Sequence, residues 1–197
     1  MRKTSILVAL AMIMLLVAAT GCKQTTNGQS PSAVNNRSRH PDTITIQGVK
    51  YSTSNTAMQL VGAGLTDEDI IPLQYMTNLN DLVLSRNEIS DISPLAGLTN
   101  LVNLNLNHNQ ISDISPLAEL TNLETLYLFN NQIVDISPLA GFTNLEELNL
   151  TDNQIVDISP LTNLDNIMAL HLAGNQIEDW TPVKHFISVT GIPFSER

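Results

Sequence analysis

The chain has 197 residues and a formal net charge of −10, and 43% of its residues are hydrophobic but only 4% are aromatic. It can therefore form a core, and that core must be mostly aliphatic. The segment 57–190 holds 17 carboxylates, and its basic residues are Arg86 and Lys184 alone, a balance of −15. Because nucleic acids and anionic membranes bind through Lys and Arg, this composition argues against both as partners of that segment.

The N-terminal residues have the organisation of an export signal. Met1-Arg2-Lys3 is a positive start, and residues 6–19 form an unbroken apolar run of 14 residues. A stable membrane-spanning helix needs about 20 apolar residues, so this run fits a signal peptide better than an anchor. It ends in Ala19-Thr20-Gly21-Cys22. We therefore predict a signal peptide over 1–21.

Cys22 is the single cysteine of the chain, so no disulfide can form within it. With the small residues before it, Cys22 resembles the end of a bacterial lipobox. That resemblance implies a lipid on Cys22 and a location on the extracellular side of the cell membrane, anchored through this lipid; ordinary secretion is the alternative. The rest of 22–42 is rich in Asn, Gln, Ser and Thr and has almost nothing to bury, which predicts a flexible tether.

A 22-residue period runs through 79–188 in five rows without insertions. The shared pattern is L-x-x-L-x-L-x-x-N-x-I-x-D-I-S-P-L-x-x-L-T-N. The x-L-x-L-x segment alternates as a strand does, and the proline interrupts any long helix, which predicts 3₁₀ turns. A row cannot be stable alone and must stack on its neighbours. We therefore predict an α/β solenoid, a leucine-rich-repeat superhelix with a concave parallel β-sheet and convex 3₁₀ turns.

Two kinds of polar residue recur once per row, and we predict a structural role for both. An asparagine amide can donate to and accept from the backbone groups at the bend after the strand, which predicts an asparagine ladder. The aspartate of D-I-S-P-L can bond local backbone N–H groups; calcium binding is the alternative for these acids, although we predict no metal. The ladder consists of Asn87, Asn109, Asn131, Asn153 and Asn175, and the aspartates are Asp91, Asp113, Asp135, Asp157 and Asp179.

The segment 43–78 is predicted to be an N-terminal cap followed by a degenerate repeat. Its apolar stretch over 43–51 is expected to form a short edge segment that covers the first coil. In the degenerate row the 22-residue register keeps Leu60 in place but puts Gly62 where a leucine belongs and Leu65 where the ladder asparagine belongs.

At the other end, Trp180 replaces the isoleucine of D-I-S-P-L. We predict that it is buried in the core of a C-terminal cap, with residues 189–197 as the tail of that cap. A role for Trp180 in binding is the alternative.

The rows resemble the internalin-type repeats of Gram-positive bacteria over roughly residues 44–193. The resemblance implies a curved solenoid with the sheet inside and 3₁₀ turns outside, and extracellular protein binding through the concave face. Invasive internalins also carry more repeats and a following immunoglobulin-like region, so we do not expect host-cell invasion to carry over. The same repeat class is similar to a eukaryotic phosphatase regulatory subunit, a role that the export signal argues against.

The outward positions of the strand segment vary from row to row while the leucines do not. Tyr127 and Phe129 lie two residues apart in the central row, and exposed aromatic side chains near the middle of a surface are common anchors of protein interfaces. We predict binding of an extracellular protein, with a cell-wall or host glycan as the alternative ligand of the same face. The predicted contact residues are Tyr127, Phe129, Asn105, Asn107, His108, Asn149 and His171.

No catalytic motif supports an enzyme. The sequence lacks G-x-S-x-G, H-E-x-x-H and a phosphate loop, so we predict neither catalysis nor a cofactor. His108 and His171 belong to rows three apart, which separates them by about 14 Å at about 4.8 Å per strand, too far to share a metal ion.

Overall fold

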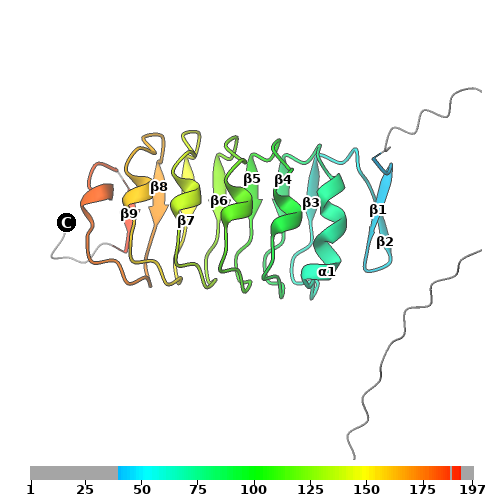
Figure 1. The fold of residues 1–197 in the computed structure, drawn as a ribbon, viewed down its shortest axis with the longest axis horizontal. Coiled ribbons are helices and arrows are strands. Elements are labelled where there is room, and N and C mark those ends of the chain that lie inside the picture. Colours follow the sequence, from blue (N-terminus) through cyan, green and yellow to red (C-terminus); the bar gives the residue numbers. More distant parts are fainter. Residues whose placement is uncertain (1–39, 187, 192–197) are drawn as a thin grey trace, which may run out of the picture. The chain divides into compact units, whose positions relative to one another are not determined.

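The computed structural model describes residues 40–186 and 188–191, which form a stack of repeating rows (Figure 1). The predicted signal peptide over 1–21, Cys22, most of the tether and the end of the C-terminal tail lie outside these residues. In the part of the chain that is described, no helix is long and apolar enough to cross a membrane.

The strands of successive rows form one parallel sheet of seven strands in chain order. The leucine at the centre of each repeat strand pairs with its equivalent 22 residues later, as Leu82 does with Leu104 and Leu104 with Leu126. These leucines are buried. The strands are β3 (Ala57–Gln59), β4 (Asp81–Val83), β5 (Asn103–Asn105), β6 (Thr125–Tyr127), β7 (Glu147–Asn149), β8 (Ala169–His171) and β9 (Val189–Thr190).

Short 3₁₀ helices form the return side of each row, opposite the sheet (Figure 1). Each has one proline, at its second residue, where the missing N–H removes no hydrogen bond of the helix. The predicted leucine-rich-repeat solenoid of strands and 3₁₀ turns is therefore confirmed. The repeat helices are η2 (Ser93–Leu95), η3 (Ser115–Leu117), η4 (Ser137–Leu139), η5 (Ser159–Leu161) and η6 (Thr181–Val183).

The recurring aspartates bond the backbone at the start of these turns. The Ser115 N–H donates to Asp113 Oδ1 over 2.8 Å, and the equivalent bond recurs at the other four aspartates. The Ser115 backbone and side-chain hydrogen bonds lower the pKa of Asp113. This local use of the carboxylates accounts for their recurrence without calcium.

The ladder asparagines join each row to the row before it. Asn131 Nδ2 donates to Leu128 O in its own row and to Leu106 O in the preceding row, over 3.0 and 3.1 Å. Its Oδ1 accepts the N–H of Ile111, also in the preceding row, over 3.1 Å. The same three bonds recur at Asn109, Asn153 and Asn175.

A second asparagine ladder, not predicted from the sequence, runs along the turn before each strand. Asn122 Nδ2 donates to Thr99 O in the preceding row over 2.9 Å. The same bond joins Asn144 to Thr121 over 2.9 Å, and it recurs at Asn100 and Asn166. These residues are exposed, so this ladder lies at the surface, whereas the first is largely buried.

The N-terminal cap is an antiparallel hairpin. Its strands β1 (Thr43–Ile46) and β2 (Val49–Ser52) pair with each other and form a sheet separate from the seven-stranded one. Gln47 and Gly48, with φ of 46° and 80°, form the two-residue turn, the conformation that suits the twist of a hairpin. Ile44 and Ile46 are buried in the core, so the hairpin closes the end of the stack.

The degenerate row departs from the predicted register by two residues. Met58, not Leu60, pairs with Leu82. Gly62, expected at a leucine position, adopts a left-handed φ of 59°. Leu65, expected at the ladder position, is fully buried in the core. The reason is that this row has two extra residues before its return side, where a turn of α-helix precedes the 3₁₀ helix, in α1 (Asp67–Ile70) and η1 (Ile71–Tyr75).

Asp67 at the start of α1 binds the first full row. Its carboxylate accepts the backbone N–H groups of Ser90 and Asp91 over 2.7 and 3.0 Å, and the Ser90 hydroxyl over 2.6 Å. Burial by itself raises the pKa of Asp67. The hydrogen bonds from Ser90 and Asp91 together lower it by more, so the pKa lies below the ordinary value of 3.8.

At the C-terminal end, Trp180 is 5% exposed and belongs to the core, as predicted. The tail beyond it adds an unpredicted strand, because Val189 and Thr190 pair with Leu170 and His171. Gly191 follows with a φ of 98°, and a Cβ there would lie 2.4 Å from Ala173 N, so only glycine fits.

Replacing a buried ladder asparagine should destabilise the fold more than replacing a surface one. Asn131→Ala removes three hydrogen bonds to buried backbone groups and should lower the free energy of unfolding by about 3 kcal/mol. The matched control Asn144→Ala removes one exposed bond and should cost about 1 kcal/mol or less. Equilibrium urea unfolding measures both values, and equal losses would contradict the assigned role of the buried ladder.

The Asp67 bonds should make stability depend on acid pH. Because the folded pKa is lowered, this contribution is present above about pH 4 and is lost as the pH falls through the folded value. Asp67→Asn should lower the unfolding temperature at pH 7 and reduce its further decline between about pH 4 and pH 2. Thermal unfolding followed by circular dichroism across this range tests the prediction, and parallel curves for the two proteins would refute it.

Candidate functional site

The outward side chains of the parallel sheet form a continuous surface, which we call the sheet face. They come from the positions on either side of each buried leucine and lie in two lines that follow the strand register. The first line is Asp81, Asn103, Thr125, Glu147 and Ala169, and the second is Val83, Asn105, Tyr127, Asn149 and His171.

Four of the predicted contact residues lie side by side in the second line. Asn105, Tyr127, Asn149 and His171 are consecutive cross-strand neighbours on β5 to β8, and each is half-buried. Tyr127 lies on β6, the middle strand of the seven. The structure therefore places this aromatic side chain at the centre of the sheet face.

The other three predicted residues gather just beyond the strand ends. The rings of His108 and Phe129 meet edge to face, with centroids 4.6 Å apart. The Phe129 N–H donates to Asn107 Oδ1 over 2.7 Å, and Asn130 Nδ2 lies 2.9 Å from His108 Nδ1. These contacts hold both rings in place beside Tyr127.

Two asparagines of the second line also shape the backbone. Asn105 Oδ1 accepts the N–H of Asn107, and Asn149 Oδ1 accepts the N–H of Thr151, each over 3.0 Å. Such bonds to the second following residue are typical of asparagine at bends. These two side chains therefore turn the chain at the strand end as well as line the sheet face.

The Tyr127 phenol stays protonated at neutral pH. Burial raises its pKa above the ordinary value of 10.0, and a hydrogen bond to Glu147 on β7 raises it further. Because a phenolate would be repelled by the Glu147 carboxylate, the neutral form is favoured.

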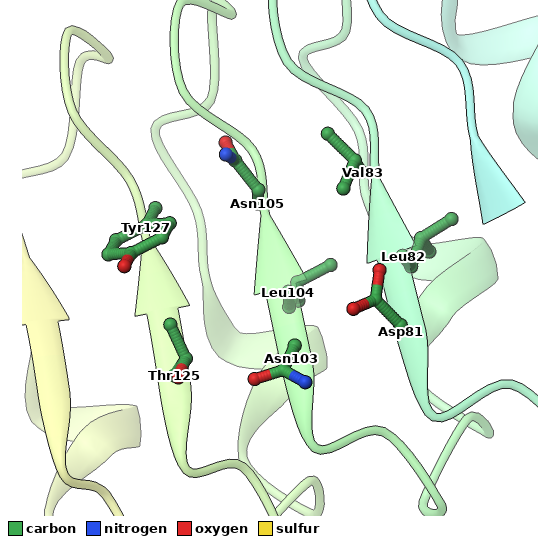
Figure 2. Close-up of a pocket in the computed structure, with 8 residues that line it drawn as sticks. All are labelled: Asp81, Leu82, Val83, Asn103, Leu104, Asn105, Thr125 and Tyr127. Atoms are coloured by element: carbon green, nitrogen blue, oxygen red, sulfur yellow. The ribbon is translucent and has the colours of Figure 1, made fainter. Parts of the chain in front are cut away.

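A hollow of about 270 Å³ opens on the sheet face over β4, β5 and β6 (Figure 2). Asp81 lines this hollow, and its Oδ1 is buried and has no hydrogen-bond partner among the described residues. Asp81 is not among the contact residues predicted from the sequence. The shape of the hollow depends on the sizes of neighbouring side chains from three rows. These are Asp81, Leu82, Val83, Asn103, Leu104, Asn105, Thr125 and Tyr127.

Among residues 40–186 and 188–191, no three His, Cys, Asp or Glu side chains lie close enough together to hold a metal ion. His108 and His171 also have separate contacts, since His171 Nδ1 lies 2.8 Å from Thr190 Oγ1. The sheet face presents amides, rings and the carboxylates of Asp81 and Glu147, groups suited to non-covalent recognition.

The comparisons with known proteins agree with this architecture. The family model for leucine-rich repeats (two copies) matches residues 77–119, 99–141, 121–163 and 143–185. The structure of internalin C2 from Listeria monocytogenes is similar, with 31% identity and a TM-score of 0.53, over 72% of this chain and 85% of that one. The chain belongs to the internalin-type leucine-rich-repeat family. The resemblance predicted from the repeat pattern is confirmed.

Two further internalin structures from Listeria monocytogenes show the same fold. The internalin InlF is 31% identical with a TM-score of 0.56, over 72% of this chain and 50% of that one, so this chain spans half of its length. The functional domain of InlJ, which includes a cysteine ladder, is 24% identical with a TM-score of 0.57, over 71% of this chain and 31% of that one. No curated protein matches the chain in sequence.

Membership of the internalin-type family supports a protein-interaction module in general terms. Proteins of this kind are typically non-enzymatic.

Proposed function

We propose that the protein is a surface-anchored module that binds an extracellular protein through the sheet face. The observation that carries this proposal is the aromatic group formed by Tyr127, on the middle strand of the sheet, and by Phe129 and His108 just beyond the strand ends. Half-buried rings held in fixed orientations lose little side-chain entropy on binding, and such residues are common interface anchors. Neither catalysis nor a cofactor is part of the proposal.

The dimensions of the sheet face favour a protein over a glycan as the ligand. Seven strands at about 4.8 Å spacing give a surface roughly 29 Å long, which is the scale of a protein interface. The excess of carboxylates in 57–190 argues against nucleic acid. Amides and a tyrosine also suit a glycan, so a cell-wall or host glycan is the alternative ligand of this face.

The anchor proposed for this module is a lipid on Cys22. The motif Ala19-Thr20-Gly21-Cys22 after an apolar run supports it. A polar tether up to residue 42 would hold the solenoid away from the membrane, at about 25 Å r.m.s. for a flexible chain of this length.

Removing the two central aromatic side chains should abolish partner capture. A photo-crosslinking amino acid at Asn149 reports on the partner while leaving Tyr127 and Phe129 unchanged. Tyr127→Ala combined with Phe129→Ala should lower the yield of the crosslinked protein at least tenfold, since central aromatic anchors contribute about 2 kcal/mol or more.

The matched control for this experiment is Val134→Ala combined with Val156→Ala, which alters two exposed apolar side chains outside the sheet face. This control should crosslink as the unaltered protein does. Unchanged capture in the aromatic double variant would refute the proposed surface. Binding to purified cell wall, with no protein crosslinked, would favour the glycan.

Replacing the lipidation cysteine should release the protein from the membrane. In Cys22→Ala the acceptor thiol is lost, so the protein should no longer incorporate labelled fatty acid and should leave the membrane fraction. Gln29→Ala in the tether is the control and should stay membrane-bound. Equal retention and labelling of both variants would contradict lipid anchoring at this residue.

A further inference from the structure

We propose that the hollow over β4, β5 and β6 receives an arginine side chain of the protein partner, with Asp81 as its counter-charge. This inference rests on the proposed function, because it names the chemistry of the partner at one place on the sheet face. The proposal concerns Asp81 and Asn103, which lie beside the aromatic group and outside the predicted contact set.

The carboxylate of Asp81 has an unmet hydrogen-bonding requirement. Asp81 lines the hollow, and its Oδ1 is buried without a hydrogen-bond partner among the described residues. An ionised carboxylate accepts hydrogen bonds and donates none, so a ligand in the hollow that stabilises the charge of Asp81 must carry an N–H or O–H group. A cationic donor satisfies it best, because charge-assisted bonds are about twice as strong as neutral ones.

The remaining walls of the hollow also suit a cationic donor. Figure 2 shows the Asp81 carboxylate extending over the sheet toward β5, with Asn103 and Thr125 beyond it and Tyr127 at the far side. Amide and hydroxyl oxygens accept hydrogen bonds, and the face of a tyrosine ring attracts a cation. A guanidinium group has five donors in a plane and stacks on aromatic rings, so arginine fits this set better than lysine.

The negative charge of the solenoid favours a basic partner. The segment 57–190 has 17 carboxylates and two basic residues, so a partner with a basic surface gains from long-range attraction. On the sheet face itself, Asp81 and Glu147 lie in the same outward line, on either side of Asn103 and Thr125. A bare metal ion is a poorer match, because no third acidic or histidine ligand joins Asp81 in the described residues.

A peptide titration tests the inference directly. The probe is a blocked pentapeptide with one central arginine among glycines, and its matched neutral analogue carries citrulline instead. With the isotope-labelled purified protein, the arginine peptide should shift the amide signals of Asp81, Asn103, Asn105 and Tyr127 in a saturable manner. The citrulline peptide should shift them at least about tenfold more weakly, because it lacks the charge.

Two variants separate the carboxylate from the rest of the surface. Asp81→Asn should weaken binding of the arginine peptide at least about tenfold, whereas Glu119→Gln, which removes the same charge from an exposed return-side residue, should leave it unchanged. Asn103→Leu, which replaces the amide with an apolar side chain of similar shape and removes its hydrogen-bond acceptor, should also weaken binding of the peptide. Circular dichroism checks that each variant is folded. If Asp81→Asn does not fold, binding of the arginine peptide to Asn103→Leu and to the unaltered protein is compared instead, and equal binding would overturn the inference.

Equal binding of the arginine and citrulline peptides, or undiminished binding in Asp81→Asn, would overturn the inference. Shifts of the same signals by a chito-oligosaccharide, but not by the arginine peptide, would overturn it in favour of a glycan. The two proposals fail separately: a captured partner whose binding needs Tyr127 and Phe129 but not Asp81 would leave the proposed function standing and remove the arginine subsite.

Discussion

The structure depends on the pairing of backbone groups between rows by the buried asparagine ladder. After each strand the chain turns toward the return side, and its N–H and C=O groups leave the sheet ladder inside the protein, where unpaired polar groups are costly. A single side chain such as Asn131 serves its own row and the row before it. The solenoid therefore holds together as a series of neighbour-to-neighbour contacts, as expected for a repeat protein.

This arrangement also explains why the ends differ from the middle. The first row has no ladder asparagine, and Asn87 of the next row accepts the N–H groups of Ala63 and Leu65 across the boundary. A hairpin covers one end of the apolar core with Ile44 and Ile46, and Trp180 lies in the core toward the other. At each end, where a neighbouring row is missing, side chains outside the regular repeat pattern are buried in the core instead.

Because the leucines and asparagines satisfy the requirements of the fold, the outward positions of the strands are free for recognition. Parallel register aligns these positions into lines, so single substitutions in separate repeats combine into one surface. Tyr127 lies at the centre because β6 is the middle strand. The parallel register also aligns Asp81 with Asn103 and Thr125 on neighbouring strands. Differences in binding within this fold therefore depend on the outward residues that the repeat pattern does not specify.

The sequence by itself determined the repeat length, the buried leucines, the ladder asparagines and the outward lines, because a strict 22-residue period leaves one way to stack the rows. It did not determine the register of the degenerate row, in which Met58 and not Leu60 pairs with Leu82. The pattern cannot show that the two extra residues of this row lie between its strand and its return side. The strand at Val189 and Thr190 and the hollow with its unpaired Asp81 oxygen were decided by the tertiary structure alone. Both depend on the shapes and distances of side chains from different rows, which no pattern within one row contains.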